Sequence, residues 1–416
     1  MSSRTIFHID VNSAYLSWEA TSRLQKGEQL DIRTVPSVIG GDSDKRQGIV
    51  LAKSIPAKHI YNIQTGETLN SACKKCPNLL IVPPNYSLYL QCSNAMVELL
   101  TNYSPIIERY SVDEVFLDFT NMENHHGHYL EAAQQMKESI KNELGFTVNI
   151  GIGSNKLLAK MASEFKKPDQ IHTLFPGDLS RKLWPLPVNN LFMVGKATEK
   201  KLRDRGISTI GELANTSREK LKLWLKSHGL LIWNYANGIE QSPVRSEGIP
   251  IKGLGNSTTT PRNITERETA ELLLLSLTEK VATRLRKINQ STKLISISIK
   301  NDQFNMYSKQ KKLSISINST LDIFKVAKQI FEELWQGEPI RHMGVSLSSL
   351  SNNDFYQYSL FDYHSSSHNL DKVIDQIRDK HGETSIIRSS FLYSSIPPFS
   401  GGVDTVEDYP MMSSLL

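Results

Sequence analysis

Acidic residues interrupt two of the most apolar runs of this 416-residue chain. Asp10 ends the run of residues 5–10, and Asp113 and Glu114 lie at the start of the run that continues to Phe119. An ionised carboxylate in an apolar strand is costly unless it is paired or bound to a metal. Three carboxylates on adjacent strands can hold two hard cations about 3.5–4 Å apart, which suits nucleotidyl transfer. Salt-bridged acids on ordinary strands are the alternative at this point.

Strand and helix patterns alternate over the first 175 residues, which predicts a mixed α/β unit. The first apolar run leads directly into a helix, and residues 111–119 predict a strand beside it. Helical spacing covers residues 128–144. A β-branched strand over residues 146–152 precedes a helix over residues 155–165, for which Ser154 is the expected N-cap.

The pattern changes twice after this unit. Residues 179–238 are helical, with breaks at prolines and glycines, and residues 241–249 form a polar, proline-containing linker. The following stretch predicts, in order, a helix, two strands, a helix and a strand, at residues 266–288, 293–300, 313–317, 322–335 and 343–350. We therefore expect an α+β multidomain protein whose last sheet has one face covered by helices.

The net charge of +5 is unevenly distributed. Residues 176–240 carry +5 and residues 241–345 carry +6, whereas residues 1–175 and 346–416 carry −1 and −5. A basic middle suits a polyanionic partner, because neutralised phosphates release counterions. No apolar run approaches the roughly 20 residues that span a bilayer, and the N-terminus lacks a signal-peptide pattern. We expect a cytoplasmic protein without a membrane partner.

Five segments, in this order along the chain, resemble the signature segments of Y-family DNA polymerases. They are IDVNSAYLSWEA (residues 9–20), SVDE (111–114), GIGSNKLLAKMASEFKKPD (151–169), VGKATEKKLRDRGISTIGELA (194–214) and KGLGNSTTT (252–260). The pattern looks closest to the UmuC-like branch of Gram-positive bacteria and their mobile elements. The resemblance implies translesion DNA synthesis of low fidelity, without proofreading, as part of the SOS response to DNA damage.

The resemblance also implies a right-hand polymerase, with each domain on a stretch of this sequence. The palm would span residues 1–20 and 80–175, the fingers 21–79, the thumb 176–240, the linker 241–249, the little finger 250–350, and a C-terminal tail 351–416. Asp10, Asp113 and Glu114 would bind two Mg²⁺ ions, with Mn²⁺ as a substitute, together with the backbone carbonyl of Val11.

Three residues would contact the deoxynucleoside triphosphate if the resemblance holds. Tyr15 falls on the steric gate, where an aromatic ring collides with a ribose 2′-hydroxyl; a core aromatic at a helix start is the alternative. Lys160 falls on the position of a lysine that contacts the triphosphate; the alternative is a solvated lysine on a helix surface. Lys58 stands where an arginine is usual and lacks its bidentate fork. Ile55 replaces a frequent tyrosine, and Asn12 replaces the usual second aspartate of the first segment.

Primer–template DNA is the expected macromolecular partner. Residues 194–214 resemble a helix-hairpin-helix, in which Val194, Gly195 and Lys196 would grip phosphates through backbone N–H groups. Met193 stands where the first glycine of the hairpin is usual. The alternative for the whole segment is a plain helical connector without a role in DNA binding. Lys293 and Lys300 would face DNA from the uncovered side of the last sheet.

The tail contains QYSLF, which resembles the peptide that docks bacterial polymerases on the sliding clamp. Leu360 and Phe361 would fill an apolar pocket and Gln357 would hydrogen-bond beside it. An apolar pair packed back on its own domain is the alternative. An accessory polymerase subunit or a recombinase is a further candidate partner.

Three hypotheses for the function follow. The first is an active translesion polymerase. The second is a protein that has lost catalysis and occupies primer ends by binding DNA and the clamp, which Asn12, Ile55 and Lys58 favour. The third is a nucleotide cyclase built on a two-metal palm, for which the basic middle of the chain is unnecessary.

Overall fold

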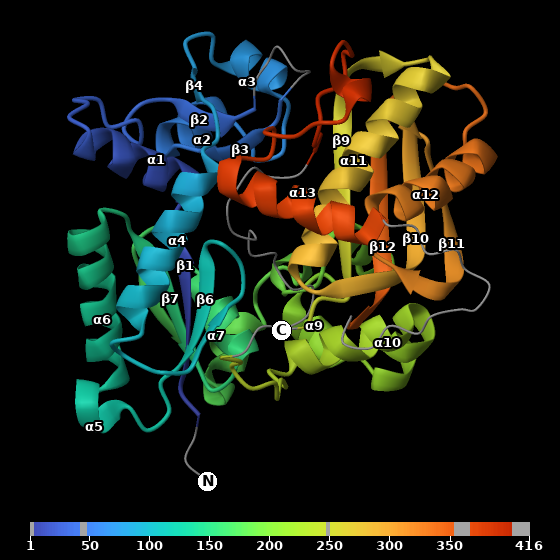
Figure 1. The fold of residues 1–416 in the computed structure, drawn as a ribbon. Coiled ribbons are helices and arrows are strands. Elements are labelled where there is room, and N and C mark those ends of the chain that lie inside the picture. The colour runs from blue at the N-terminus through green and yellow to red at the C-terminus, as the bar shows by residue number, and fades with distance from the viewer. Residues whose placement is uncertain (1–3, 42–47, 247–249, 353–366, 402–416) are drawn as a thin grey trace. The chain divides into compact units, whose positions relative to one another are not determined.

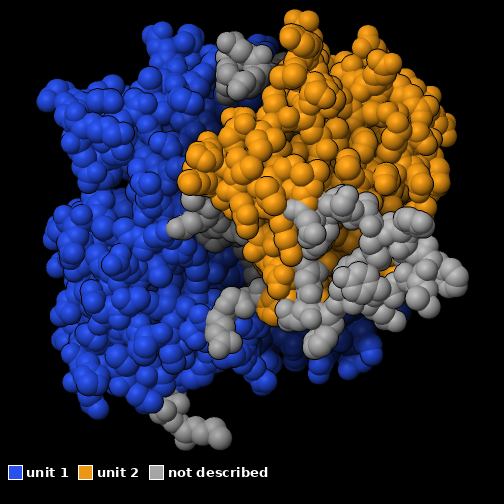
Figure 2. Space-filling model, in the orientation of Figure 1, with its two compact units in different colours: residues 1–41, 48–248, 404–416 blue, residues 42–47, 249–403 orange. Residues whose placement is uncertain are grey.

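The computed structural model forms two compact units (Figures 1 and 2). The described residues are 4–41 and 48–246 in the first unit, and 250–352 and 367–401 in the second. Both units combine helices with sheets, so the predicted α+β multidomain class is confirmed. No helix in these described ranges is long and apolar enough to cross a membrane.

A five-stranded sheet in the order β5-β6-β1-β7-β8 forms the centre of the first unit (Figure 1). Its strands are β1 Ile6–Val11, β5 Ile107–Arg109, β6 Glu114–Asp118, β7 Val148–Gly153 and β8 Ile171–Leu174. β1 is antiparallel to both β6 and β7, and β8 runs parallel to β7. The first apolar run of the sequence is therefore the central strand, and all six of its residues are buried.

The two faces of this sheet pack against different helices. On one face, apolar side chains such as Phe7 and Ile9 form a core with α4 (Tyr86–Leu100) and α6 (Tyr129–Ser139). On the other face, α7 (Lys156–Ser163) lies close to β7. A side chain at Gly151 would meet the backbone of α7, at 2.0 Å from the Ala159 carbonyl oxygen. The glycines of this strand thus permit the close approach of α7.

The start of α7 differs from the prediction. Asn155, not Ser154, is the N-cap, because its side chain accepts a hydrogen bond from the N–H of Leu158 at 2.8 Å. The helix is also shorter than predicted and ends at Ser163. The side chain of Lys156, the first residue of this helix, is buried, and its ammonium donates to both carboxylate oxygens of Glu108, each at 2.8 Å.

A smaller three-stranded sheet follows α1 (Ala14–Gln25) in the chain. Its order is β3-β2-β4, and β2 is antiparallel to β3 and parallel to β4. Its strands and helices are β2 Ser37–Gly40, β3 Val50–Lys53, α2 Ile55–Tyr61, α3 Leu69–Lys75 and β4 Leu80–Val82. They share a small core of their own around Val38 and Ile63.

The predicted helical stretch begins with two short helical segments, Leu179–Leu183 and Val188–Asn190, and continues with α8 (Lys196–Arg203), α9 (Ile210–Ala214) and α10 (Arg218–Ala236). Its apolar side chains join α7 in one core. The start of the predicted linker belongs to the same unit, because Val244 is buried and the N–H of Arg245 donates to Glu108 at 2.8 Å.

The second unit contains a four-stranded antiparallel sheet in the order β11-β10-β12-β9. Its elements are β9 Gly253–Ile264, α11 Arg267–Lys287, β10 Gln290–Asn301, β11 Met306–Ile317, α12 Thr320–Leu334 and β12 Ile340–Asn352. The helix–strand–strand–helix–strand order was predicted, but β9 was missed. Apolar side chains of the sheet pack against α11 and α12, as expected for a sheet with one covered face.

The described part of the C-terminal stretch packs against the second unit. Helix α13 (Ser367–His381) is held by ion pairs from Asp375 to Arg286 at 2.5 Å and from Arg378 to Glu279 at 2.9 Å. Further along, the hydroxyl of Ser276 donates to the carbonyl of Pro397 at 2.8 Å. The described part of the predicted C-terminal tail therefore belongs to the folded second unit.

Candidate active site

The strand register brings two of the three predicted carboxylates together. Asp10 on β1 is the direct antiparallel partner of Glu114 on β6, so both side chains lie on the face of the sheet that α7 covers. Asp113 immediately precedes β6, and its carbonyl accepts a hydrogen bond from the N–H of Val11 at 3.1 Å. Its carboxylate accepts from the Ser111 hydroxyl at 2.7 Å.

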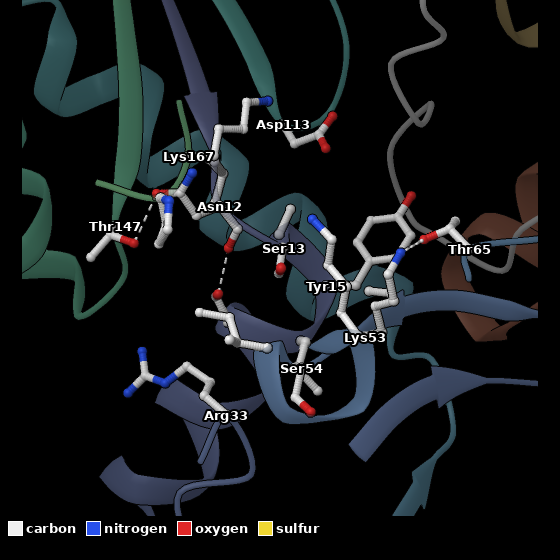
Figure 3. A pocket seen from close by; sticks show the side chains of 18 of the residues that line it. Asn12, Ser13, Tyr15, Arg33, Lys53, Ser54, Thr65, Asp113, Thr147 and Lys167 are labelled. Atoms are coloured by element: carbon white, nitrogen blue, oxygen red, sulfur yellow. Dashed lines mark hydrogen bonds between the residues drawn. The ribbon is translucent and has the colours of Figure 1, made fainter. Parts of the chain in front are cut away.

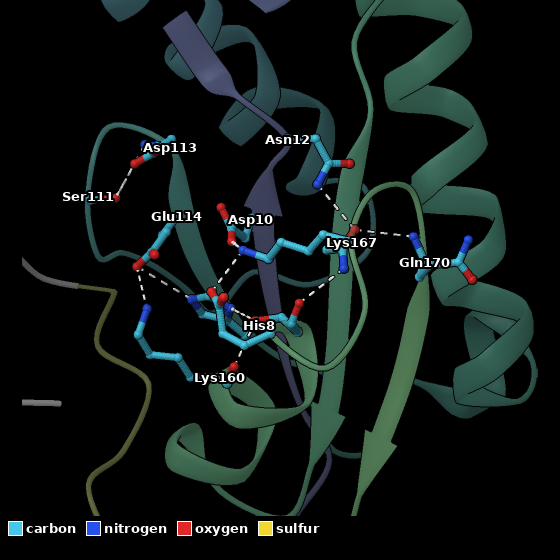
Figure 4. Close-up of polar contacts among 12 residues, drawn as sticks. His8, Asp10, Asn12, Ser111, Asp113, Glu114, Lys160, Lys167 and Gln170 are labelled. Atoms are coloured by element: carbon cyan, nitrogen blue, oxygen red, sulfur yellow. Dashed lines mark hydrogen bonds and ion pairs between the residues drawn. The ribbon is translucent and has the colours of Figure 1, made fainter. Parts of the chain in front are cut away.

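Glu164 joins Asp10 and Glu114, two carboxylates labelled in Figure 4. Carboxylate oxygens of Asp10, Glu114 and Glu164 lie within 4.8 Å of one another, which is compact enough for one metal ion. Asp113 is not in that group and instead lines an adjacent cavity. The sequence did not predict Glu164, although it lies inside the third signature-like segment.

Two lysines neutralise these carboxylates (Figure 4). The Lys160 ammonium donates to Glu114 at 2.6 Å. The Lys167 ammonium donates to Asp10 and, at 2.8 Å, to Glu164. The predicted nucleotide-binding lysine, Lys160, is thus buried against Glu114, and Lys167 is the lysine that also lines the cavity.

His8 completes the surroundings of Glu114. Its ring is fully buried, with Nε2 at 3.7 Å from Glu114 and Nδ1 at 2.8 Å from the Ser163 hydroxyl. Burial, aided by the charge of Lys160, lowers the pKa of His8 to about 4. His8 is therefore neutral at neutral pH, and Lys160 is the cation that pairs with Glu114.

The surroundings shift the pKa values of the three carboxylates in different directions. Burial would raise the pKa of Glu114, but contacts from His8 and Lys160 outweigh it and lower that pKa, and Lys160 supplies the positive charge because His8 is neutral. For Asp10, burial outweighs the pairing with Lys167 and raises the pKa. Burial also raises the pKa of Asp113 despite its bond from Ser111. A divalent cation would stabilise the ionised forms of both aspartates, so the donor set fits a hard metal.

A cavity of about 600 Å³ lies beside the carboxylates (Figure 3). The start of α1 supplies one part of its wall, and β3 and α2 supply another. Its described lining contains the cations Arg33, Lys53, Lys58 and Lys167, with Asp113 as the single acid. Burial and the charge of Lys58 lower the pKa of Lys53. This excess of positive charge favours a polyanionic ligand such as a triphosphate.

Tyr15 lines this cavity and also packs against other aromatics. Its ring stacks on Tyr89 with centroids 4.5 Å apart and contacts Tyr86 edge-on at 6.3 Å. Tyr15 is therefore part of an aromatic cluster as well as of the cavity wall, and its role as a steric gate stays a prediction. Lys58, Val11 and the two departures Asn12 and Ile55 line the cavity as well.

The predicted DNA-binding residues belong to other elements than those that carry the carboxylates. Val194 is buried, Gly195 is the N-cap of α8, and Lys196 is the exposed first residue of that helix. Met193 has a positive φ of 72° in the preceding turn. On β10 of the second unit, Lys293 and Lys300 are partly exposed, and Lys300 ends the stretch in which partly exposed serines alternate with buried isoleucines. Gln357, Leu360 and Phe361 of the clamp peptide lie outside the described residues.

Comparison with known proteins places the chain in a family. The impB/mucB/samB family matches residues 9–164, and the C-terminal domain of that family matches residues 251–360. A protein of Clostridium acetobutylicum named DNA polymerase IV is 49% identical over 94% of this chain and 98% of its own length. DNA polymerase IV of Acetivibrio thermocellus is 36% identical over the same shares of both chains.

The fold agrees with this relationship. A solved Y-family DNA polymerase chimera of Dbh and Dpo4 superposes with a TM-score of 0.71, at 23% identity, over 84% of this chain and all of its own. The chain therefore belongs to the Y family of DNA polymerases, the translesion class, and has its palm, fingers, thumb and little-finger architecture. The relatives are named DNA polymerase IV, so the UmuC-like branch stays a prediction.

Proposed function

We propose that this chain extends a primer on a DNA template by two-metal nucleotidyl transfer at the carboxylates of Asp10, Asp113 and Glu114. The observation that carries the proposal is the direct pairing of Asp10 with Glu114, beside a cationic cavity that Asp113 also lines. Val11 would add its backbone carbonyl, and its N–H already bonds the carbonyl of Asp113.

The residues present fit two Mg²⁺ ions, with Mn²⁺ as the substitute. All the proposed donors are oxygen atoms, which hard divalent cations prefer. Bound Mg²⁺ would supply activation of the primer 3′-oxygen and charge stabilisation of the leaving pyrophosphate. Glu164, which the sequence did not predict, also lies near Asp10, and its pairing with Lys167 suits a supporting role.

The cavity beside the carboxylates is the proposed site for the deoxynucleoside triphosphate. Lys58 and Lys167 line it and would face the phosphates, whereas the burial of Lys160 against Glu114 suits an electrostatic role behind the metals. Tyr15 would act as the steric gate, because its ring is held in the cavity wall by stacking on Tyr89. Its rigidity would exclude a ribose 2′-hydroxyl.

Primer–template DNA is the proposed partner of the thumb and little finger. The backbone around Val194, Gly195 and Lys196 would contact phosphates, as would the side chains of Lys293 and Lys300. The clamp peptide at residues 357–361, an accessory subunit or recombinase, and a cytoplasmic, nucleoid-associated location remain part of the proposal on sequence grounds alone. So do the domain boundaries given above.

A primer-extension assay with purified protein tests the proposal. We expect Mg²⁺-dependent, template-directed addition of nucleotides that stops when EDTA removes the metal. Tight DNA binding without any extension would support the alternative of a protein that only occupies primer ends. Formation of cyclic nucleotide from free triphosphate without DNA would support the cyclase, which the family relationship does not favour.

A further inference from the structure

The side chains of Asn12 and Asn149 hold the turn that connects α7 to β8, and Figure 4 labels Asn12 and Gln170 of this group. Asn149 on β7 is fully buried and lies opposite Asp10 in the register of β1 and β7. Asn12 follows β1, and its Nδ2 donates to Asn149 Oδ1 at 3.1 Å. The pair therefore lies directly beside the proposed metal site.

Together the two amides bond four backbone groups of the turn at residues 163–170. These groups are the carbonyls of Ser163 and Lys166, which accept from Asn149, the N–H of Gln170, which donates to Asn149, and the N–H of Asp169, which donates to Asn12. The four distances are 3.0, 2.7, 3.2 and 2.9 Å respectively. The turn is thus fixed at its start, its middle and its end.

The orientation of both amides follows from their partners. Asn149 Nδ2 faces two carbonyls, which only accept, and its Oδ1 faces the N–H of Gln170, which only donates. Asn12 must therefore present its Nδ2 to Asn149, and its Oδ1 accepts from Thr147 and Asp169. An aspartate at position 12 would have no donor and would set a carboxylate against Asn149 Oδ1.

The turn carries Lys167, whose ammonium bonds Asp10 and Glu164 and whose side chain lines the cavity. We propose that Asn12 and Asn149 are positioning residues that hold Lys167 at the nucleotide site. This inference rests on the proposed function of the cavity. It also gives a physical reason for the departure at position 12, since only the amide can bond both Asn149 and the backbone of the turn.

Steady-state insertion of one nucleotide by the full chain tests the inference. Asn12→Ala removes the bonds without adding charge, and Asn12→Asp removes the donor and adds a charge beside Asp10. We expect both variants to raise the KM for the incoming nucleotide about tenfold, the loss of one charge-assisted contact, and to change kcat less. A higher KM in Asn12→Asp alone would show a charge effect and overturn the positioning role.

A double-variant cycle separates positioning from general destabilisation. If the asparagines act through Lys167, Asn12→Ala adds little to the KM of Lys167→Met, so the two effects are not additive. Additive effects would overturn the inference. Thermal unfolding of each variant identifies any that fails to fold; in that case Asn149→Ala is carried through the same cycle and decides it.

Lys141→Ala is the matched control. Its ammonium lies 3.6 Å from the carboxylate of Asp169, so it contacts the same turn, but from the solvent side with 57% of its side chain exposed. We expect an unchanged KM, because an exposed pair of this kind contributes little. Wild-type protein that fails to extend primers would refute the proposed function, whereas active wild type with an unaltered KM in Asn12→Ala would refute this inference alone.

Discussion

The Lys160 ammonium lies 2.6 Å from a carboxylate oxygen of Glu114, on the face of the palm sheet that α7 covers. Only 9% of the Lys160 side chain is exposed, and the ammonium also lies 4.9 Å from the centre of the Tyr110 ring. Lys160 therefore balances the charge of a carboxylate that we propose to bind metal, and the phosphates of a nucleotide would meet Lys167 instead.

The two lysines should respond differently to neutral replacement. Lys167→Met should raise the KM for the incoming nucleotide about 10-fold or more, because a charge-assisted contact contributes roughly 1.5–3 kcal/mol. Lys160→Met should lower the free energy of unfolding by roughly 2–3 kcal/mol, because it leaves the carboxylate of Glu114 largely buried and unpaired. Nucleotide titrations and urea unfolding measure the two effects, and a reversal of this pattern would restore Lys160 as the phosphate contact.

Replacement of Tyr15 should change the choice of sugar. Tyr15→Ala opens the cavity wall, so incorporation of ribonucleotides relative to deoxynucleotides should rise at least about tenfold. Tyr15→Phe is the control: it keeps the ring stacked on Tyr89 and should keep the discrimination. Competition between matched ribo- and deoxynucleotides on one template measures this ratio, and the gate assignment fails if Tyr15→Ala discriminates like the wild type.

A buried ion pair should stabilise the palm and the segment that leaves the thumb. Lys156 is fully buried and bonds Glu108, which also accepts the N–H of Arg245. Lys156→Met leaves a buried charge unpaired and should lower the free energy of unfolding by about 3–5 kcal/mol. The double variant Lys156→Met/Glu108→Gln should recover part of this loss. Urea unfolding at neutral pH measures both, and equal stability of the single variant and the wild type would contradict the prediction.

Strand patterning drew attention to Asp10, Asp113 and Glu114 but left salt-bridged acids as the alternative, and the resemblance to Y-family polymerases assigned these residues to the metals. Asp10 ends a buried strand, and the register with β6 places it opposite Glu114. The two lysines show the limit of such reasoning. Lys160 and Lys167 lie seven residues apart in one motif-like segment, and only the packing of α7 shows that the first pairs with Glu114 and the second reaches the cavity.

Strand β9 was missed because its own sequence carries little signal. Glycine and polar residues dominate Gly253–Ile264, and the strand forms because β12 pairs with it, for example Leu254 with Leu347. The N-cap of α7 was placed one residue early because Ser154 and Asn155 are both good caps, and backbone geometry decides between them. Tertiary contacts thus overrode local preference at both places.

The central claim is that Asp10, Asp113 and Glu114 bind the metals for nucleotidyl transfer. Asp113→Asn tests it most directly. Within the described residues Asp10 and Glu114 are each paired with a lysine, whereas no ion pair of Asp113 is found, so the substitution leaves no cation unpaired. An asparagine at this position can also still accept the hydrogen bond from Ser111. With DNA affinity and thermal unfolding close to wild type, primer extension in Mg²⁺ should fall at least about 10³-fold. Full extension by the folded Asp113→Asn variant would contradict the account.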